Sequence, residues 1–197
     1  SMAMSGFFAQ SFLTRDNYQD LLKDCFQTMK LFGSKVAFLP LGGSGKDWQQ
    51  EGCAAYQQMV SRLRTAGEMA KQEGITIGIR TGMGAKFDKK LLKKVGSSQI
   101  KVYYNFQDAA DHHRDICKEL RKLGAQRIVQ IHVSNTDSVN LQEDPEINLP
   151  KIRKTLDKMK WSGWLVVERS RDVKRVRDVK YNFGRNIAYL KQVFQER

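Results

Sequence analysis

Four polar side chains stand at the ends of short apolar, β-branched segments. They are Arg80 after residues 75–79, Asn105 after 100–104, His132 within 128–133, and Glu168 after 164–167. Imidazole and carboxylate groups transfer protons and bind metal ions, whereas a guanidinium group binds anions. Because these residue types recur at equivalent places along the chain, we interpret them as candidates for a shared site.

Strand geometry predicts that the four side chains share one face. Alternate residues of a strand point to the same side, so Arg80 aligns with Gly78 and His132 with Gln130. Each residue also has a purely structural interpretation. A histidine within a strand is often a hydrogen-bonded core residue, and a glutamate at a strand end is often simply exposed. The recurrence in successive repeats favours function.

The elements that would position these residues alternate along the chain. Amphipathic helical patterns end near glycine, and apolar segments follow at 36–39, 75–79, 100–104, 128–133 and 164–168. Glycine ends helices readily because it adopts the left-handed conformation without strain. This alternation predicts an α/β fold with a parallel sheet. Residues 4–12 are expected to form a sixth strand or the loop that follows one.

Length and composition are typical of a globular chain. The 197 residues predict one domain over 1–197, with Ser1-Met2 interpreted as remnants of expression. We find no apolar run of the ~20 residues that cross a membrane, so no membrane partner is expected. Three scattered cysteines indicate reduced thiols and a cytoplasmic location.

The chain is strongly basic. Lys and Arg number 34 against 21 Asp and Glu, a formal net charge of +13. Such a charge suits nucleic acid, an acidic membrane or a phosphorylated substrate. Exposed aromatic residues interleaved with the basic ones, which would indicate a nucleic-acid groove, are not evident. We therefore interpret the charge as a solvated basic exterior and expect no nucleic-acid partner.

Five to six predicted strands are fewer than the eight of a closed (β/α)₈ barrel, which typically needs ~250 residues. The chain is therefore predicted to be an incomplete barrel with an exposed sheet edge. Such an edge invites pairing, so we expect a homo-oligomer or strand pairing between chains. A Gly/Ser-rich loop at 41–52 follows one strand and carries Lys46, which is suited to a sugar phosphate.

Four segments of the sequence resemble the sugar phosphate isomerase/epimerase group of the xylose isomerase-like TIM barrels. They lie at 36–42, 103–108, 131–137 and 163–170. The resemblance implies a TIM barrel lacking its N-terminal strands and a proton-transfer reaction on a sugar or sugar phosphate. It also implies four inward divalent-metal ligands: Glu, Asp, His and Glu.

Two of the four ligands implied by the resemblance are present. His132 and Glu168 match the family's His and last Glu, whereas Arg80 and Asn105 replace the first Glu and the Asp. An arginine cannot ligate a metal or act as a base at neutral pH. We therefore expect no cofactor, and only weak or absent metal binding at His132 and Glu168.

The remaining roles combine the resemblance with the chemistry of the residues. His132 and Glu168 are the candidate catalytic residues. The candidate substrate-binding residues are Lys46, Arg80, Asn105, Asp108, Asn135, Asp137 and Arg169. Arg80 is predicted to take the metal's electrostatic place and to pair with Glu168, directly or through an anion.

Three alternatives stay open at this point. The chain is a sugar isomerase or epimerase, a catalytically degenerate and metal-free sugar- or anion-binding protein, or a fragment whose missing strands come from a partner. An endonuclease is less favoured. Its site of three zinc ions needs several histidines as well as carboxylates, and this chain has only three histidines in all. His112 and His113 are interpreted as surface residues near a helix start.

Overall fold

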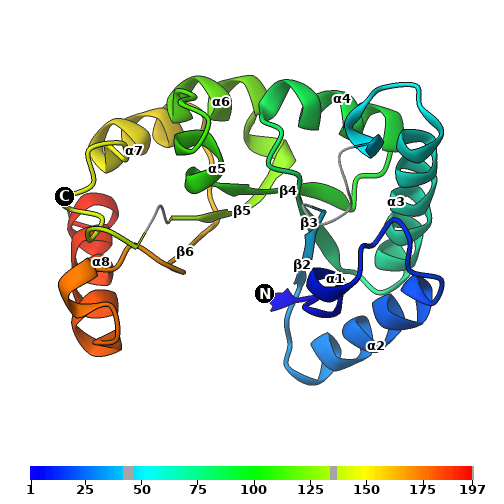
Figure 1. The fold of residues 1–197 in the computed structure, drawn as a ribbon, viewed down its shortest axis with the longest axis horizontal. Helices are drawn as coiled ribbons and strands as arrows, with labels where there is room; N and C mark the ends of the chain where they lie inside the picture. Colours follow the sequence, from blue (N-terminus) through cyan, green and yellow to red (C-terminus); the bar gives the residue numbers. More distant parts are fainter. Residues whose placement is uncertain (42–46, 134–136, 197) are drawn as a thin grey trace. The chain divides into compact units, whose positions relative to one another are not determined.

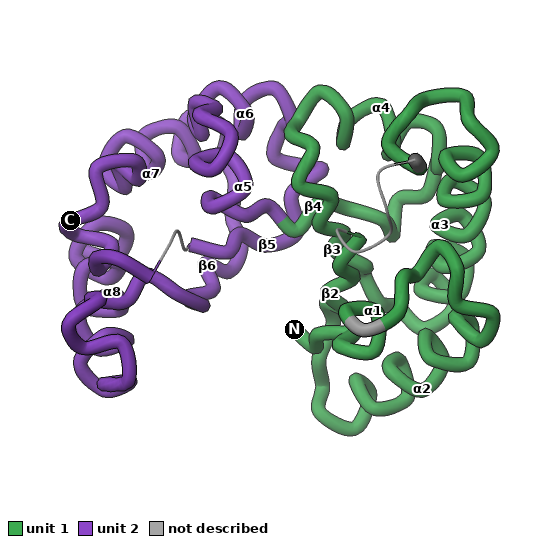
Figure 2. Tube along the Cα trace, viewed as in Figure 1, with its two compact units in different colours: residues 1–103 green, residues 104–197 purple. Residues whose placement is uncertain are grey.

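The computed structural model describes residues 1–41, 47–133 and 137–196. The chain divides into two compact units, residues 1–103 and residues 104–197 (Figure 2), which are described separately below. The single domain expected over 1–197 stays a prediction. Candidate residues Lys46 and Asn135 lie outside the described residues.

Unit 1 alternates strands with helices. Its elements are β1 (Met2–Ala3), α1 (Gly6–Ala9), α2 (Tyr18–Leu31), β2 (Val36–Pro40), a 3₁₀ turn at Asp47–Gln49, α3 (Ala54–Gln72), β3 (Thr76–Arg80), α4 (Ala85–Val95) and most of β4 (Ile100–Asn105). The strands pair in parallel, with Phe38 opposite Gly78 and Ile79 opposite Val102. Figure 1 shows α2 and α3 beside β2 and β3.

Residues 4–12 follow the sixth strand, the second of the two predicted alternatives, rather than forming it. Residues Met2–Ala3 form β1 and pair with Ala37 and Phe38 of β2, whereas the predicted segment 4–12 contains the short helix α1. Phe7 and Phe12 of that segment are buried and pack edge to face, with ring centroids 5.3 Å apart. Their burial explains the apolar signal that suggested a strand.

Unit 2 continues the alternation. It holds the end of β4, then α5 (Phe106–Ala110), α6 (Ile116–Leu123), a 3₁₀ turn at Ala125–Arg127, β5 (Ile128–His132), α7 (Leu149–Lys158), β6 (Trp164–Val166), a 3₁₀ turn at Val173–Arg175 and α8 (Val179–Phe194). β5 and β6 pair in parallel, with His132 opposite Val166. Side-chain oxygens cap four of the helices at Asn105, Asp115, Asn148 and Asp178.

The strand order in the sheet follows the chain from β1 to β6, and the strand pairs that join β1 to β4 and β5 to β6 are parallel. The predicted α/β architecture is therefore confirmed, with six strands among the described residues against the eight of a closed barrel. The described helices include none that combines the length and apolar character needed to cross a membrane.

The buried face of α8 differs from the predicted one. The spacing of Phe183, Ile187, Leu190 and Phe194 predicts an apolar stripe, but the buried residues of α8 are Asn182, Asn186 and Leu190. Ile187 is 43% exposed. The amide side chains are buried because they bind backbone groups of neighbouring loops, which hydrophobic periodicity does not register.

Candidate functional site

Asn105 ends β4 and begins α5. Its Oδ1 accepts a hydrogen bond from the backbone N–H of Gln107 at 2.8 Å, as an N-cap residue does. The side chain is buried, and this bond fixes which end of the amide is which. The Nδ2 group therefore faces Nδ1 of His132, 3.5 Å away.

His132 ends β5 and contacts the carboxylate of Glu168. Its Nδ1 lies 3.3 Å from Oε2 of Glu168, which follows β6 by two residues. The imidazole is nearly buried, with 9% of its side chain exposed, whereas 49% of the Glu168 side chain is exposed. The pair thus joins a sheltered ring to a carboxylate that a solute can reach.

The two neighbours of His132 compete for the same ring nitrogen. A protonated Nδ1 donates to Glu168, whereas a bare Nδ1 accepts from the amide of Asn105. The protonation state of the imidazole therefore decides which contact is made.

The donor atoms in unit 2 do not fit the divalent metal that the resemblance implies. His132 and Glu168 supply one nitrogen and one carboxylate, and the Asn105 oxygen is already engaged by α5. Among the described residues, no group of three or more His, Cys, Asp and Glu side chains could hold a metal ion. Divalent ions prefer several oxygen or nitrogen ligands, with anionic ones among them, so we derive no step through a metal.

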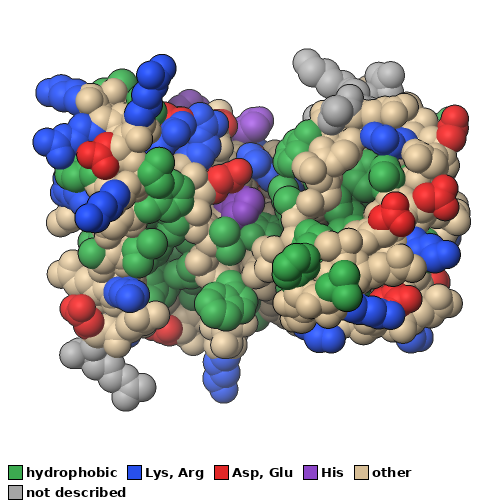
Figure 3. Space-filling view, turned by 90° about the horizontal axis from the view of Figure 1, so that it is seen from below, with side chains coloured by type: hydrophobic (Ala, Val, Ile, Leu, Met, Phe, Trp, Pro, Cys, Tyr) green, Lys and Arg blue, Asp and Glu red, His purple; other side chains and the backbone are tan. Residues whose placement is uncertain are grey.

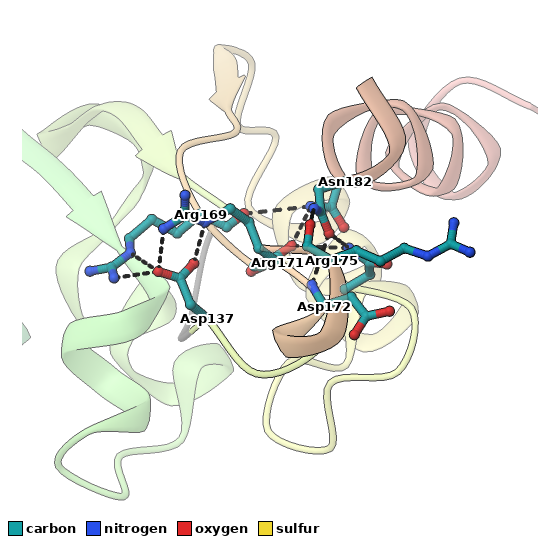
Figure 4. Close-up of polar contacts among 9 residues, drawn as sticks. Asp137, Arg169, Arg171, Asp172, Arg175 and Asn182 are labelled. Carbon is teal, nitrogen blue, oxygen red and sulfur yellow. Dashed lines mark hydrogen bonds and ion pairs between the residues drawn. The ribbon is translucent and has the colours of Figure 1, made fainter. Parts of the chain in front are cut away.

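Asp137 and two arginines form a cluster beside the loop that carries Glu168 (Figure 4). Oδ2 of Asp137 accepts from Arg169 Nη2 and Arg171 Nη2, each at 2.5 Å, and Oδ1 accepts from Arg171 Nε at 2.8 Å. Hydrogen bonds from Arg171, followed by those from Arg169, hold the pKa of Asp137 well below its ordinary value. The cluster ties residues after β5 to residues after β6.

The remaining predicted site residues lie as follows. Asp108 is in the first turn of α5, and its carbonyl accepts from Nδ1 of His112 at 2.9 Å. Arg80 ends β3 in unit 1 and is half-buried. The predicted pairing of Arg80 with Glu168 joins residues of different units and stays a prediction. His112 and His113 are exposed, as expected.

Sequence reasoning missed three buried asparagines, Asn140, Asn182 and Asn186, which bind the backbone of the segment that follows Glu168. Nothing in their spacing marks them except that Asn182 and Asn186 are four residues apart and so share one helix face. A polar pair at that spacing, on a helix with an apolar residue four positions on, is the one signal that could have found them.

Comparisons with solved structures support the fold. The chain is similar to D-psicose 3-epimerase from Clostridium cellulolyticum H10, with a TM-score of 0.73 and 14% identity over 91% of this chain and 70% of that one. It is also similar to a sugar phosphate isomerase/epimerase from Parabacteroides distasonis, with a TM-score of 0.71 and 16% identity over 91% of this chain and 66% of that one.

A third similar structure is an AP endonuclease of family 2 from Brucella melitensis, with a TM-score of 0.69 and 14% identity over 86% of this chain and 70% of that one. The chain thus spans about two thirds of the length of these structures. A search of curated proteins found no match. At such identities the likeness shows the fold alone.

The family whose pattern matches this chain is described as the xylose isomerase-like TIM barrel, and the match runs over residues 5–193. That span includes the ends of β4, β5 and β6, where Asn105, His132 and Glu168 lie. Since the match covers nearly the whole chain, this protein belongs to the xylose isomerase-like TIM barrel family.

Proposed function

We propose that this protein is a sugar isomerase that acts by proton transfer on a small sugar or sugar phosphate, with Glu168 as the base and His132 as its partner. The observation that carries the proposal is the 3.3 Å contact between Nδ1 of His132 and Oε2 of Glu168. An exposed carboxylate held by a sheltered imidazole suits removal and return of a proton at carbon. The sugar epimerases among the similar structures support the substrate class.

The arrangement favours isomerisation over epimerisation. In isomerisation, the carboxylate takes a proton from the hydroxyl-bearing carbon beside a carbonyl, leaving an enediol(ate), and returns it to the neighbouring carbon on the same face. The proton of that hydroxyl passes to the former carbonyl oxygen, so that the carbonyl moves to the first carbon. Epimerisation instead needs a second acid on the opposite face of the sugar. His132 touches Glu168, so these two groups do not stand on opposite faces of a substrate.

The test is exchange of carbon-bound hydrogen with solvent. The protein is incubated in D₂O with D-psicose, D-fructose, D-tagatose or L-ribulose, and with their phosphates, and deuterium at carbon and the products are followed by NMR. We expect exchange and an aldose product with the parent chain, and loss of at least about a hundredfold in Glu168→Gln, the scale of a lost general base.

Glu143→Gln is the matched control. Glu143 also lies in unit 2 and pairs with Arg185 at 2.5 Å, an exposed ion pair of small energetic weight. Exchange at the parent rate in this variant would show that the loss belongs to Glu168. Equal exchange in Glu168→Gln and the parent would overturn the proposal.

A second candidate is a metal-free protein that binds a sugar or anion without turnover. The engagement of the Asn105 oxygen by α5, which removes a metal ligand, favours it. Saturable binding of a sugar or sugar phosphate by calorimetry, with no deuterium incorporation, would select this candidate.

The proposal also covers the protein's partners, location and self-association. We infer a small-molecule partner, a cytoplasmic location, no nucleic-acid partner and self-association through the open sheet edge. Self-association is tested by the Trp164 variant discussed below.

A further inference from the structure

Glu168 lies on an irregular segment, residues 167–178, that joins β6 to α8. Within unit 2, its carboxylate pairs with the imidazole of His132. Its side chain is half exposed, so packing does little to hold it. The position of the carboxylate is therefore set by the backbone of this segment.

The centre of the segment is buried and conformationally constrained. Ser170 is fully buried, and its φ of 72° lies in the left-handed region that a non-glycine residue rarely adopts. Such a conformation persists when surrounding contacts demand it. Two amide side chains, of Asn140 and Asn186, supply contacts to its carbonyl.

Asn186 of α8 binds the backbone on both sides. Its Nδ2 donates to the carbonyl of Ser170 at 2.7 Å, and its Oδ1 accepts from the N–H of Leu141 at 2.9 Å. Asn140 donates to the same Ser170 carbonyl at 3.2 Å. The carbonyl two residues after Glu168 thus has two side-chain donors.

Asn182, one helical turn earlier, holds the rest of the segment (Figure 4). Its Oδ1 accepts from the N–H of Asp172 at 2.8 Å, and its Nδ2 donates to the carbonyls of Arg175 and Asp178 at 2.6 and 2.8 Å. The side chain of Asn140 donates to the same Oδ1 at 2.9 Å. The hydrogen bonds of Asn182 thereby hold the backbone from residue 172 to residue 178, which includes the 3₁₀ turn at Val173–Arg175.

Burying two amides on one helix face costs stability unless each hydrogen bond is made. An apolar pair at these positions would suffice to seat α8, as Leu190 does one turn later. What the amides add is a fixed path for residues 168–178. We propose that Asn182 and Asn186 are positioning residues that hold the Glu168 segment so that its carboxylate meets His132; the inference rests on the proposed function.

The variants Asn182→Asp and Asn186→Asp test this. Each keeps the shape of the side chain and its acceptor oxygen but replaces the donating NH₂ by an oxygen. In Asn186→Asp that oxygen faces the carbonyl of Ser170, so the contact becomes repulsive. Leu190→Ala is the control for lost packing on the same buried face, and Asn148→Asp, at the exposed cap of α7, is the control for the added charge.

Two readouts are measured on the full chain, at a temperature where every variant is folded by circular dichroism. The first is hydrogen–deuterium exchange of peptides covering 168–174, expected to be about tenfold faster in both Asn→Asp variants, the effect of an unmade buried hydrogen bond. The second is deuterium exchange into the sugar, where kcat is expected to fall about tenfold with KM nearly unchanged. Leu190→Ala, compared at an equal loss of unfolding free energy, is expected to change neither the exchange rate of residues 168–174 nor kcat.

The outcomes separate this inference from the proposed function. Faster exchange in 168–174 with no sugar activity in the parent chain would leave the positioning of the segment supported and overturn its catalytic purpose. Exchange at 168–174 that rises equally in Leu190→Ala and Asn186→Asp would show general loosening of α8 and overturn the inference. Sugar activity retained in both Asn→Asp variants would overturn it as well.

Discussion

At the scale of single residues, the amide of Asn105 decides what His132 and Glu168 can do. Its oxygen caps α5 and its nitrogen faces the imidazole, and as a neutral amide it adds no charge to the site. The result is a site with one carboxylate and one imidazole. We propose that this pair transfers the proton without the help of a metal ion.

The variant Asn105→Asp is expected to create a divalent-metal site. Aspartate caps a helix as well as asparagine does, so α5 should be retained, while its second oxygen adds an anionic ligand beside His132 and Glu168. Titration calorimetry with Mn²⁺ should show saturable binding in the variant and none in the parent chain. Asn148→Asp is the control; binding there, or tight binding in the parent, would contradict the assignment.

Asp137 predicts a pH dependence of stability. Because its folded-state pKa lies below the unfolded value of about 3.9, its contribution is full above that value and is lost as the pH falls through the folded pKa. Asp137→Asn should cost about 1–2 kcal/mol at pH 7, since the arginines are partly exposed and solvent screens the pair.

The check is urea unfolding of parent and variant at pH 7, 5 and 3. The difference in unfolding free energy should be constant from pH 7 to about 5 and shrink toward pH 3, where the unfolded carboxyl takes up its proton. Asp157→Asn, an exposed residue paired with Arg153 in α7, should show a small difference throughout. A difference in unfolding free energy between parent and variant that grows as the pH falls would contradict this prediction.

At the scale of elements, two helical glycines make opposite predictions. A Cβ added at Gly67 of α3 would lie 2.3 Å from Oγ and 2.7 Å from Cβ of Ser97, whereas one at Gly184 of α8 meets nothing within 4 Å. Gly67→Ala should therefore destabilise by about 1–3 kcal/mol, despite the better helix propensity of alanine.

Gly184→Ala should stabilise by about 0.5–1 kcal/mol, because alanine loses less conformational entropy in a helix. Thermal unfolding of the two variants against the parent chain measures both effects. Stabilisation by both substitutions would show that α3 moves away from Ser97 at little cost, contrary to the close packing in the structure.

At the scale of the whole molecule, β6 is the last strand in the sheet order, and its far edge pairs with no strand among the described residues. Beside it, in unit 2, a groove of about 720 Å³ is lined by apolar residues such as Leu165, Ile187 and Phe194, together with the polar side chains of Asp157, Lys191 and Gln195. Trp164 is 75% exposed. Hydrophobic side chains reach the surface of unit 2 in Figure 3. An open edge flanked by apolar surface invites association.

The substitution Trp164→Glu should lower self-association. A charge on this strand opposes burial of the edge against another chain, so sedimentation velocity should show a smaller mean mass than for the parent chain at equal concentration. Phe32→Glu is the matched control, because Phe32 is also 75% exposed but lies at the end of α2 in unit 1. An equal fall in mean mass in both variants, or a parent chain that sediments as a monomer, would contradict association through this edge.

Much of the architecture could be predicted from the chain's own pattern. Five of the six strands begin or end within a few residues of their predicted segments, since continuous β-branched runs bounded by glycine have few other conformations. The places of Asn105, His132 and Glu168 at or just beyond strand ends followed from the same pattern. The two-residue strand β1 could not be recognised in the sequence, because two residues show no alternation, and only the segment that follows it was predicted.

What the sequence by itself determined is the order of elements and the identity of the side chains at their ends, because both are local. Tertiary structure alone decided that the Asn105 oxygen is engaged by α5, that Asp137 binds Arg169 and Arg171, and that α8 buries Asn182 and Asn186 rather than its apolar stripe. Hydrogen-bond partners tens of residues apart leave no trace in periodicity. A polar side chain is buried wherever its bonds are met, and only the folded chain brings those partners together.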